Sequence, residues 1–252
     1  MKVFATSDIH LDYPENQKWL SNLSALDYQD DVLILAGDIT DNLTLLRHCF
    51  DCLSPKFKRV MFVPGNHELW VIRDDHVSSI DKYHSVCKLA RDHGIDMHVY
   101  KNGDLSIVPL QSWYDFSFGQ PNTKLNDCWM DFRACVWPNN ESAAEISHFF
   151  LSKNTEFLNT QNHTLISFSH FLPRIDLMPS YIPKSMDFLH PVMGAASLEK
   201  QIRQLSPKIH VYGHSHVNQK IEMDGIYYIN NAFGYPSEKR ISSKKLRCIH
   251  EQ

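Results

Sequence analysis

Short runs of apolar and β-branched residues recur along the chain, and turn residues bound each run. Five runs, at residues 2–6, 31–36, 59–63, 164–168 and 208–212, carry enough Val, Ile, Leu, Phe or Tyr to predict strands inside a sheet. Further strands are predicted at residues 104–110, 217–223, 226–229 and 245–249, with Asp224 and Gly225 as a hairpin turn between two of them.

Segments with helical spacing of apolar residues separate these strands. The predicted helices cover residues 16–26, 43–53, 75–93, 141–159 and 195–205. This alternation is typical of a layered α/β fold. A chain of 252 residues can build one sizeable core, and it contains no internal repeat, low-complexity tract or linker. We therefore predict a single domain over residues 1–252, with an aromatic-rich insertion at residues 112–140.

Composition and charge narrow the functional class. Hydrophobic residues make up 43% of the chain, but no apolar run approaches the ~18–20 residues of a membrane-spanning helix. The formal net charge of −4 does not provide the broad positive field of a non-specific nucleic-acid binder, so a small or locally steered substrate fits better. One basic cluster, at residues 239–247, is interpreted as a solvated strand or tail, and a nucleic-acid contact there stays open.

Six cysteines in a chain of this length do not form a dense disulfide scaffold. Met1 and Lys2 lead directly into an apolar strand, without a secretory signal. We therefore expect a cytoplasmic protein. Cys49 and Cys52 form a C-x-x-C pair within a predicted helix, where this spacing indicates a shared buried face rather than a redox or zinc site.

Residues able to bind a metal follow each of the five strongest strands at its C-terminal end. They form Asp-x-His at 8–10, Gly-Asp at 37–38, Gly-Asn-His-Glu at 65–68, a single His at 170 and Gly-His-x-His at 213–216. Ligands of an open α/β sheet bind beyond the carboxyl ends of its strands, so these side chains should converge. In an extended chain, the i, i+2 spacing would also direct both members of each pair to one side.

The donor set consists of imidazole, carboxylate and amide groups, without a thiolate. This set favours Mn, Fe, Zn, Co or Ni over a structural thiolate zinc site. Two metals about 3.5–4 Å apart can clamp a phosphoryl oxygen and convert a shared water to hydroxide near neutral pH. Ligand chemistry alone does not choose among these metals. We expect metal-assisted phosphoester hydrolysis with two divalent ions, and Mn²⁺ is the first to supply in an assay. His170 is preferred over His163 because it follows its strand, whereas His163 precedes it.

These five motifs resemble the signature of the calcineurin-like metallophosphoesterase superfamily, from Asp8 to His216. The resemblance implies a four-layer α/β/β/α fold, in which a β-sandwich is flanked by helices. It also implies two metal sites and one bridging carboxylate. The implied ligands are Asp8, His10 and His216 for one metal, Asn66, His170 and His214 for the other, and Asp38 as the bridge.

The resemblance assigns two further residues to catalysis. His67 would contact the phosphate and protonate the leaving alkoxide, and Asp41 would orient His67. Glu68, which completes the Gly-Asn-His-Glu motif, is expected to hold the loop rather than bind a metal.

Departures from better-known branches narrow the substrate. After Asp38 the chain lacks both the Asp-Arg-Gly continuation of the protein serine/threonine phosphatases and the tyrosine ligand of the purple acid phosphatases. It looks more like the compact bacterial-type phosphoesterases, which implies a small phosphorylated substrate or nucleotide and leaves monoesters and diesters both open. A metal-dependent nuclease and a non-catalytic scaffold are the alternatives. The aromatic insertion is expected either to line the substrate pocket or to form a satellite core, through Trp113, Tyr114, Trp129 and Arg133.

Overall fold

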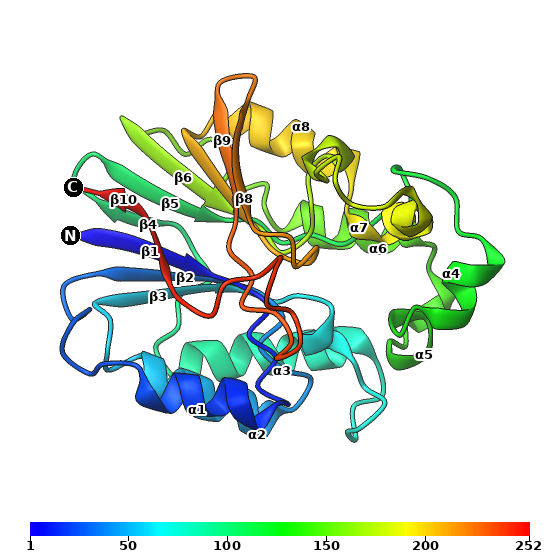
Figure 1. Ribbon diagram of the computed structural model, residues 1–252, viewed down its shortest axis with the longest axis horizontal. Helices are drawn as coiled ribbons and strands as arrows, with labels where there is room; N and C mark the ends of the chain where they lie inside the picture. Colours follow the sequence, from blue (N-terminus) through cyan, green and yellow to red (C-terminus); the bar gives the residue numbers. More distant parts are fainter.

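Two sheets lie face to face in the computed structural model, which describes residues 1–252 (Figure 1). The first sheet has the order β10-β1-β2-β3. Its strands are β1 (Lys2–Thr6), β2 (Val32–Ala36), β3 (Arg59–Val63) and β10 (Arg247–Glu251). The second sheet has the order β4-β5-β6-β7-β9-β8. Its strands are β4 (Tyr100–Asn102), β5 (Leu105–Pro109), β6 (Thr164–Phe168), β7 (Ile209–Tyr212), β8 (Gln219–Met223) and β9 (Ile226–Asn230).

The central strands of both sheets are parallel and covered on both faces. Strand β2 pairs in parallel with β1 and β3, and all five of its residues are buried. Strands β5, β6, β7 and β9 form the parallel part of the second sheet. A continuous apolar run suits such strands because neither face meets water. Val3, Ile34, Met61, Ile107 and Ile166 belong to the cluster that fills the space between the sheets.

Helices cover the two outer faces and complete a four-layer arrangement. On the first sheet lie α1 (Pro14–Asn22), α2 (Leu43–Leu53) and α3 (Ser79–Asp92), where Leu46 and Phe50 of α2 pack on Leu33 and Leu35 of β2. On the second sheet lie α6 (Ala143–Ser152) and α8 (Ala196–Leu205). The predicted fold class, a layered β-sandwich core flanked by helices, is confirmed.

Two irregular segments lie at the end of the molecule to which the parallel strands point (Figure 1). The aromatic insertion contains α4 (Thr123–Cys128), α5 (Asp131–Ala134) and η2 (Pro138–Asn140). A second segment contains η3 (Ile175–Leu177), η4 (Lys184–Leu189) and α7 (His190–Met193). A short turn, η1 (His67–Leu69), follows β3. No helix is long and apolar enough to cross a membrane.

Most predicted elements are confirmed, and the differences have local causes. The helix predicted over residues 141–159 ends at Ser152. Beyond it, the Asn154 side chain accepts from the backbone N–H of Gln111 at 2.8 Å and donates to its carbonyl at 2.9 Å. The helix predicted from residue 75 begins at Ser79, because the Ser78 side chain caps it by accepting from the N–H of Asp81. Strand β4 has three residues, which is too short for a sequence pattern.

The C-terminal basic cluster has a partly structural role. Lys239, Arg240 and Lys245 are exposed, as predicted for a solvated segment. Lys244 is also exposed, but its ammonium group donates to the carbonyl oxygens of Gly234 and Tyr235, both at 2.8 Å. It therefore holds the loop between β9 and β10 in place.

Candidate metal centre

The predicted ligands converge where the two sheets meet. Strands β1, β2 and β3 bring Asp8, His10, Asp38 and Asn66 from the first sheet, while β6 and β7 bring the remaining three histidines from the second. Three groups have ligand atoms within 4.8 Å of one another. They are Asp8 with His10 and His216, His10 with Asp38 and His67, and Asp38 with His170 and His214.

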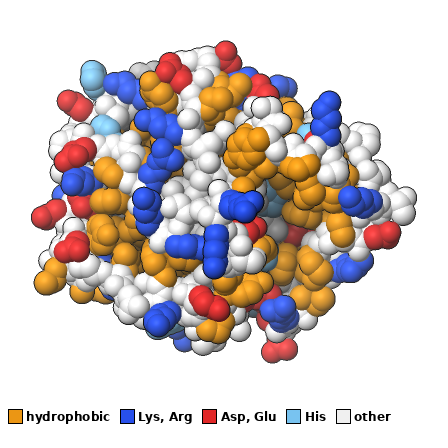
Figure 2. All heavy atoms as spheres, in the orientation of Figure 1, with side chains coloured by type: hydrophobic (Ala, Val, Ile, Leu, Met, Phe, Trp, Pro, Cys, Tyr) orange, Lys and Arg blue, Asp and Glu red, His pale blue; other side chains and the backbone are white.

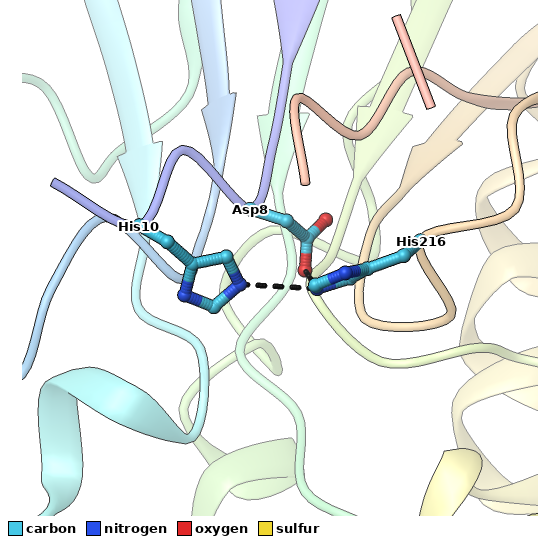
Figure 3. Close-up of side chains that lie close together, drawn as sticks. All are labelled: Asp8, His10 and His216. Atoms are coloured by element: carbon cyan, nitrogen blue, oxygen red, sulfur yellow. Dashed lines mark hydrogen bonds and ion pairs between the residues drawn. The ribbon is translucent and has the colours of Figure 1, made fainter. Parts of the chain in front are cut away.

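The first ligand set consists of Asp8, His10 and His216, and their side chains point toward one another in Figure 3. The Nε2 atoms of His10 and His216 are 3.0 Å apart. His216 Nε2 also lies 3.3 Å from Asp8 Oδ1. Asp8 is fully buried and accepts the backbone N–H of His214 at 3.0 Å. Three donors from β1 and β7 thus face one point.

The second set is arranged around His170. Its Nε2 lies 3.1 Å from His214 Nδ1, 3.2 Å from Asn66 Oδ1 and 3.4 Å from Asp38 Oδ2. Asp38 occurs in two of the three groups, and its position between both sets suits a shared carboxylate.

Outer hydrogen bonds fix the orientation of three rings. His170 Nδ1 donates to the carbonyl oxygen of Ala36 at 2.8 Å, and His214 Nε2 donates to that of Val192 at 3.1 Å. His216 Nδ1 is 2.7 Å from Glu238 Oε2. In each ring, the opposite nitrogen is then the one that faces the site, which is the arrangement of a metal-binding histidine. The donor set and its tautomers therefore fit divalent cations.

The backbone at five of these residues is left-handed. Asp8, His10, Asp38, His214 and His216 have φ between 46° and 65°, a region that residues other than glycine rarely adopt. The two i, i+2 pairs therefore reach one side of the site through left-handed residues and not through an extended chain. Such conformations cost about 1–3 kcal/mol each and gather at functional sites that hold them in place.

Two glycines allow the ligand loops to approach closely. A Cβ on Gly37 would lie 2.5 Å from His170 Nδ1, and a Cβ on Gly65 would collide with Asp38 Oδ1. Gly37 also has a φ of 82°. Close packing of glycine against the ligands thus explains why both residues precede ligand positions.

Buried carboxylates control the charge of the site. Burial lowers the pKa of His170, but Asp38, Asp8 and the carbonyl of Ala36 together outweigh this effect and raise it to about 9. Burial also lowers the pKa of His216, and the carboxylates of Asp8 and Glu238 together outweigh it and raise the pKa to about 10. His214, where burial dominates, has its pKa lowered to about 3. Without cations, these carboxylates hold protons on His170 and His216, and metal binding must displace these protons.

His67 lies beside the ligands without joining either set. Its backbone N–H donates to Asp38 Oδ1 at 3.0 Å, and its ring stacks on Trp70 with centroids 3.7 Å apart. His67 Nε2 is 3.8 Å from Asp38 Oδ2, which is beyond hydrogen-bonding distance. The ring lines a cavity of about 220 Å³ and keeps a free nitrogen.

Asp41 lines the same cavity as His67, but no hydrogen bond joins them. Both of its carboxylate oxygens are buried without a hydrogen-bond partner, and Arg73 Nη1 is 3.5 Å from Oδ2. Burial and the nearby Asp12 raise the pKa of Asp41. The orienting role predicted for Asp41 therefore stays a prediction, and Trp70 is the residue that supports the His67 ring here.

Glu68 has the structural role expected from the sequence. Its carboxylate accepts four backbone N–H groups, from Asp38, Ile39, Thr40 and Gly65, at 2.6 to 3.1 Å. A single buried side chain thus joins the loop after β2 to the loop after β3. These loops carry Asp38 and Asn66, the predicted bridge and one of the predicted ligands.

Two outer residues were missed by the sequence analysis, Asp131 and Glu238. Asp131 is buried in the aromatic insertion, and its Oδ1 accepts from Asn66 Nδ2 at 2.9 Å and from Trp70 Nε1 at 2.7 Å. Its Oδ2 accepts from Trp129 Nε1 at 2.9 Å. Asp131 therefore turns the amide oxygen of Asn66 toward His170. Neither acidic residue lies in a motif, so no local signal marks them.

In the aromatic insertion the core role is confirmed for two residues, and the role in substrate binding stays a prediction. Trp113 and Tyr114 are 1% and 3% exposed and belong to the core under the second sheet. Trp129 lines a cavity that also includes His214 and His216. Arg133 lines neither this cavity nor the one beside His67, and its guanidinium donates a hydrogen bond to the carbonyl oxygen of Asp127.

Comparison with known proteins agrees with this geometry. Residues 1–218 match the calcineurin-like phosphoesterase family, and the chain belongs to this family. The family supports phosphoester hydrolysis and implies divalent metal ions.

The chain is similar to the acyl-carrier-protein phosphodiesterase PptH of Mycobacterium tuberculosis, with 30% identity over 125 residues. This segment covers 46% of the chain but only 38% of that relative. An uncharacterized protein of Acanthamoeba polyphaga mimivirus is 26% identical over 258 residues, which cover 92% of this chain and 91% of the viral protein. The crystal structure of the phosphopantetheinyl hydrolase PptH from M. tuberculosis has the same fold, with a TM-score of 0.83 at 23% identity. It covers 98% of this chain and 95% of that one.

Proposed function

We propose that the chain is a phosphodiesterase that uses two divalent cations. Asp8, His10 and His216 would hold one cation, and Asn66, His170 and His214 the other, with Asp38 shared. The observation that carries this proposal is the pairing of inward ring nitrogens at 3.0 and 3.1 Å, next to two buried carboxylates. When bound, the cations would supply positive charge for the phosphoryl oxygens and lower the pKa of an attacking water.

His67 is the residue that supports a proton-transfer step. Its ring nitrogen is free, faces a cavity and is held in place by the stacked Trp70. From this position it can donate a proton to the leaving alkoxide, which contributes typically ~10²- to 10⁴-fold to the rate. The unpartnered carboxylate of Asp41 lines the same cavity and could orient the ring when a substrate is bound.

Two observations favour a diester over a monoester. The relative with 30% identity is a phosphodiesterase by name. The metal centre also has a cavity on each of two sides, one with His67 and one with His214 and His216, so both arms of a diester have room.

The test is hydrolysis of bis-p-nitrophenyl phosphate by the Mn²⁺-loaded protein. We expect turnover, and its absence with each of Mn, Fe, Zn, Co and Ni would refute the proposal. His67→Ala should lose most activity and keep its metals, whereas Asp38→Ala should lose metals as well. Equal metal content in the two variants would contradict the assignment of His67 as proton donor and Asp38 as metal ligand.

A matched pair of histidine variants tests the fourth motif. His170→Ala removes a buried ring nitrogen from the centre, whereas His163→Ala changes an exposed histidine just before β6. We expect His163→Ala to retain the wild-type metal content and His170→Ala to lose metal. The opposite result would place the ligand at His163.

A further inference from the structure

Two cavities adjoin the metal centre, and they share one lining residue, Tyr235. The Tyr235 ring lies between them, with its centroid 4.4 Å from that of His10 and 4.9 Å from that of His216. Each cavity therefore reaches the centre from a different side. The chemistry of their walls differs strongly.

The smaller cavity, on the His67 side, is polar. It has a volume of about 220 Å³ and is lined by ionisable side chains, including Asp12, Asp41 and Arg73. Asp41 has two buried oxygens without a partner, and Arg73 is largely exposed. This cavity suits a polar group that can form hydrogen bonds.

The larger cavity, on the His214 and His216 side, is mainly apolar. It has a volume of about 320 Å³, and methionine and aliphatic side chains from the second irregular segment line it. The principal ones are Met178, Ile182, Met186, Leu189 and Met193. Figure 2 shows a hollow in which histidine atoms are visible, with hydrophobic side chains gathered along its margin.

The ionisable side chains Glu238 and His190 of the larger cavity already contact other protein groups. Glu238 accepts from His216 Nδ1 at 2.7 Å and from the backbone N–H of Tyr235 at 2.8 Å. His190 Nε2 is 3.5 Å from Asp187 Oδ1. The cavity therefore offers little to a charged ligand, whereas unbranched methionine side chains adapt well to a flexible apolar chain.

We propose that the apolar cavity binds the uncharged, flexible arm of a phosphodiester that stays esterified to the phosphate. This inference rests on the phosphodiesterase function proposed above.

The position of His67 gives the reaction its direction. Water oxygen bonds to phosphorus and releases a proton to solvent, and the bond from phosphorus to the leaving alcohol oxygen breaks with its electron pair on that oxygen. His67 donates the proton to that oxygen, so the leaving alcohol lies in the polar cavity, and His67 later regains its own proton from solvent. The other arm points into the apolar cavity, and it leaves as a phosphate monoester.

Alkyl p-nitrophenyl phosphates test the apolar cavity, because the leaving group is constant and the retained arm varies. Each buried CH₂ is worth a factor of about 4 in affinity. If half of the five extra carbons of a hexyl arm are buried, kcat/KM for the hexyl ester exceeds that of the methyl ester about 30-fold. A ratio near 1 in the Mn²⁺-loaded wild type would overturn the proposal.

A charge placed in the cavity should remove this preference. Met186→Glu changes an exposed rim residue, 42% accessible, that lines the cavity. Lys184→Glu alters an exposed residue of the same helix, η4, which does not line it. We expect Met186→Glu to reduce the hexyl-to-methyl ratio below 5-fold, about a sixth of the wild-type value, while Lys184→Glu retains it. Equal ratios in the two variants would contradict the proposal.

The direction of cleavage is tested with hexyl 2-methoxyethyl phosphate, whose two arms are both primary alkyl esters. Mass spectrometry should find hexyl phosphate as the main monoester. Predominant 2-methoxyethyl phosphate would overturn the assignment of the two cavities. Failure to hydrolyse any of these diesters with any metal would instead refute the phosphodiesterase function itself.

Discussion

Asp131→Asn is expected to weaken metal binding although Asp131 does not face either metal site. Its two carboxylate oxygens accept three hydrogen bonds, from Asn66, Trp70 and Trp129, at 2.7 to 2.9 Å. Asparagine has one acceptor oxygen, so at least one of these N–H donors would meet an NH₂ group. If the donor is Asn66, its amide loses the contact that points its oxygen toward His170.

Asp131→Asn should change both the free energy of unfolding and the affinity for metal, and the contacts of Asp131 indicate the size of each change. Loss of a hydrogen bond to a charged group costs about 1.5–3 kcal/mol. Burial raises the pKa of Asp131, so the folded protein already disfavours its charge, and removal of that charge offsets part of this cost. We therefore expect the free energy of unfolding to fall by less than about 2 kcal/mol, whereas loss of an outer-shell partner weakens metal binding about 10- to 100-fold.

Calorimetric titration of the metal-free protein with Mn²⁺ measures the loss of metal affinity. Urea unfolding in the presence of chelator measures the fall in the free energy of unfolding. Asp127→Asn is the matched control, since it makes the same change at an exposed residue of the same insertion. Equal Mn²⁺ affinity in the two variants would refute the orienting role of Asp131. A large loss of stability with unchanged affinity would assign Asp131 to folding alone.

Other parts of the site give three further predictions. Glu68→Gln turns an NH₂ toward backbone donors and should lower the free energy of unfolding by roughly 3 kcal/mol, and an unchanged urea midpoint would contradict this. Gly65→Ala should displace Asp38 and reduce bound metal, as measured by elemental analysis; full occupancy would argue against close packing there. Burial lowers the pKa of His210 to about 3, so the unfolded chain takes up a proton below pH 6.5 that the folded chain does not. Between pH 7.5 and 5.0 the wild type should lose about 2 kcal/mol more stability than His210→Gln, and equal losses would refute this.

The sequence predicted the central strands well and also named side chains that the structure brings close together, because both depend on local patterns. Strands such as β2 are buried on both faces and read as unbroken apolar runs. The candidate ligands could be named because the ends of parallel strands meet in space, and the same rule favoured His170, which is fully buried beside the other candidates, over the exposed His163.

Features that depend on contacts between distant segments could not be predicted. The end of α6 is set by Asn154, whose side chain bonds to the backbone of Gln111 beyond β5. Asp131 acquires its role only when the insertion folds against Asn66 and Trp70. The apolar cavity likewise comes from a segment without regular spacing of its hydrophobic residues.

The predicted ligands of each proposed cation site come from both sheets, so they leave the ribosome at different times. Asp8 and His214 are 206 residues apart in the chain. At about 5–20 residues per second, roughly 10–40 s pass on the ribosome between the appearance of the first ligand and that of the β7 histidines. The nascent chain therefore lacks a complete set of the predicted ligands for most of its synthesis, and on the proposed function the cations can bind only once the β7 histidines have folded into place.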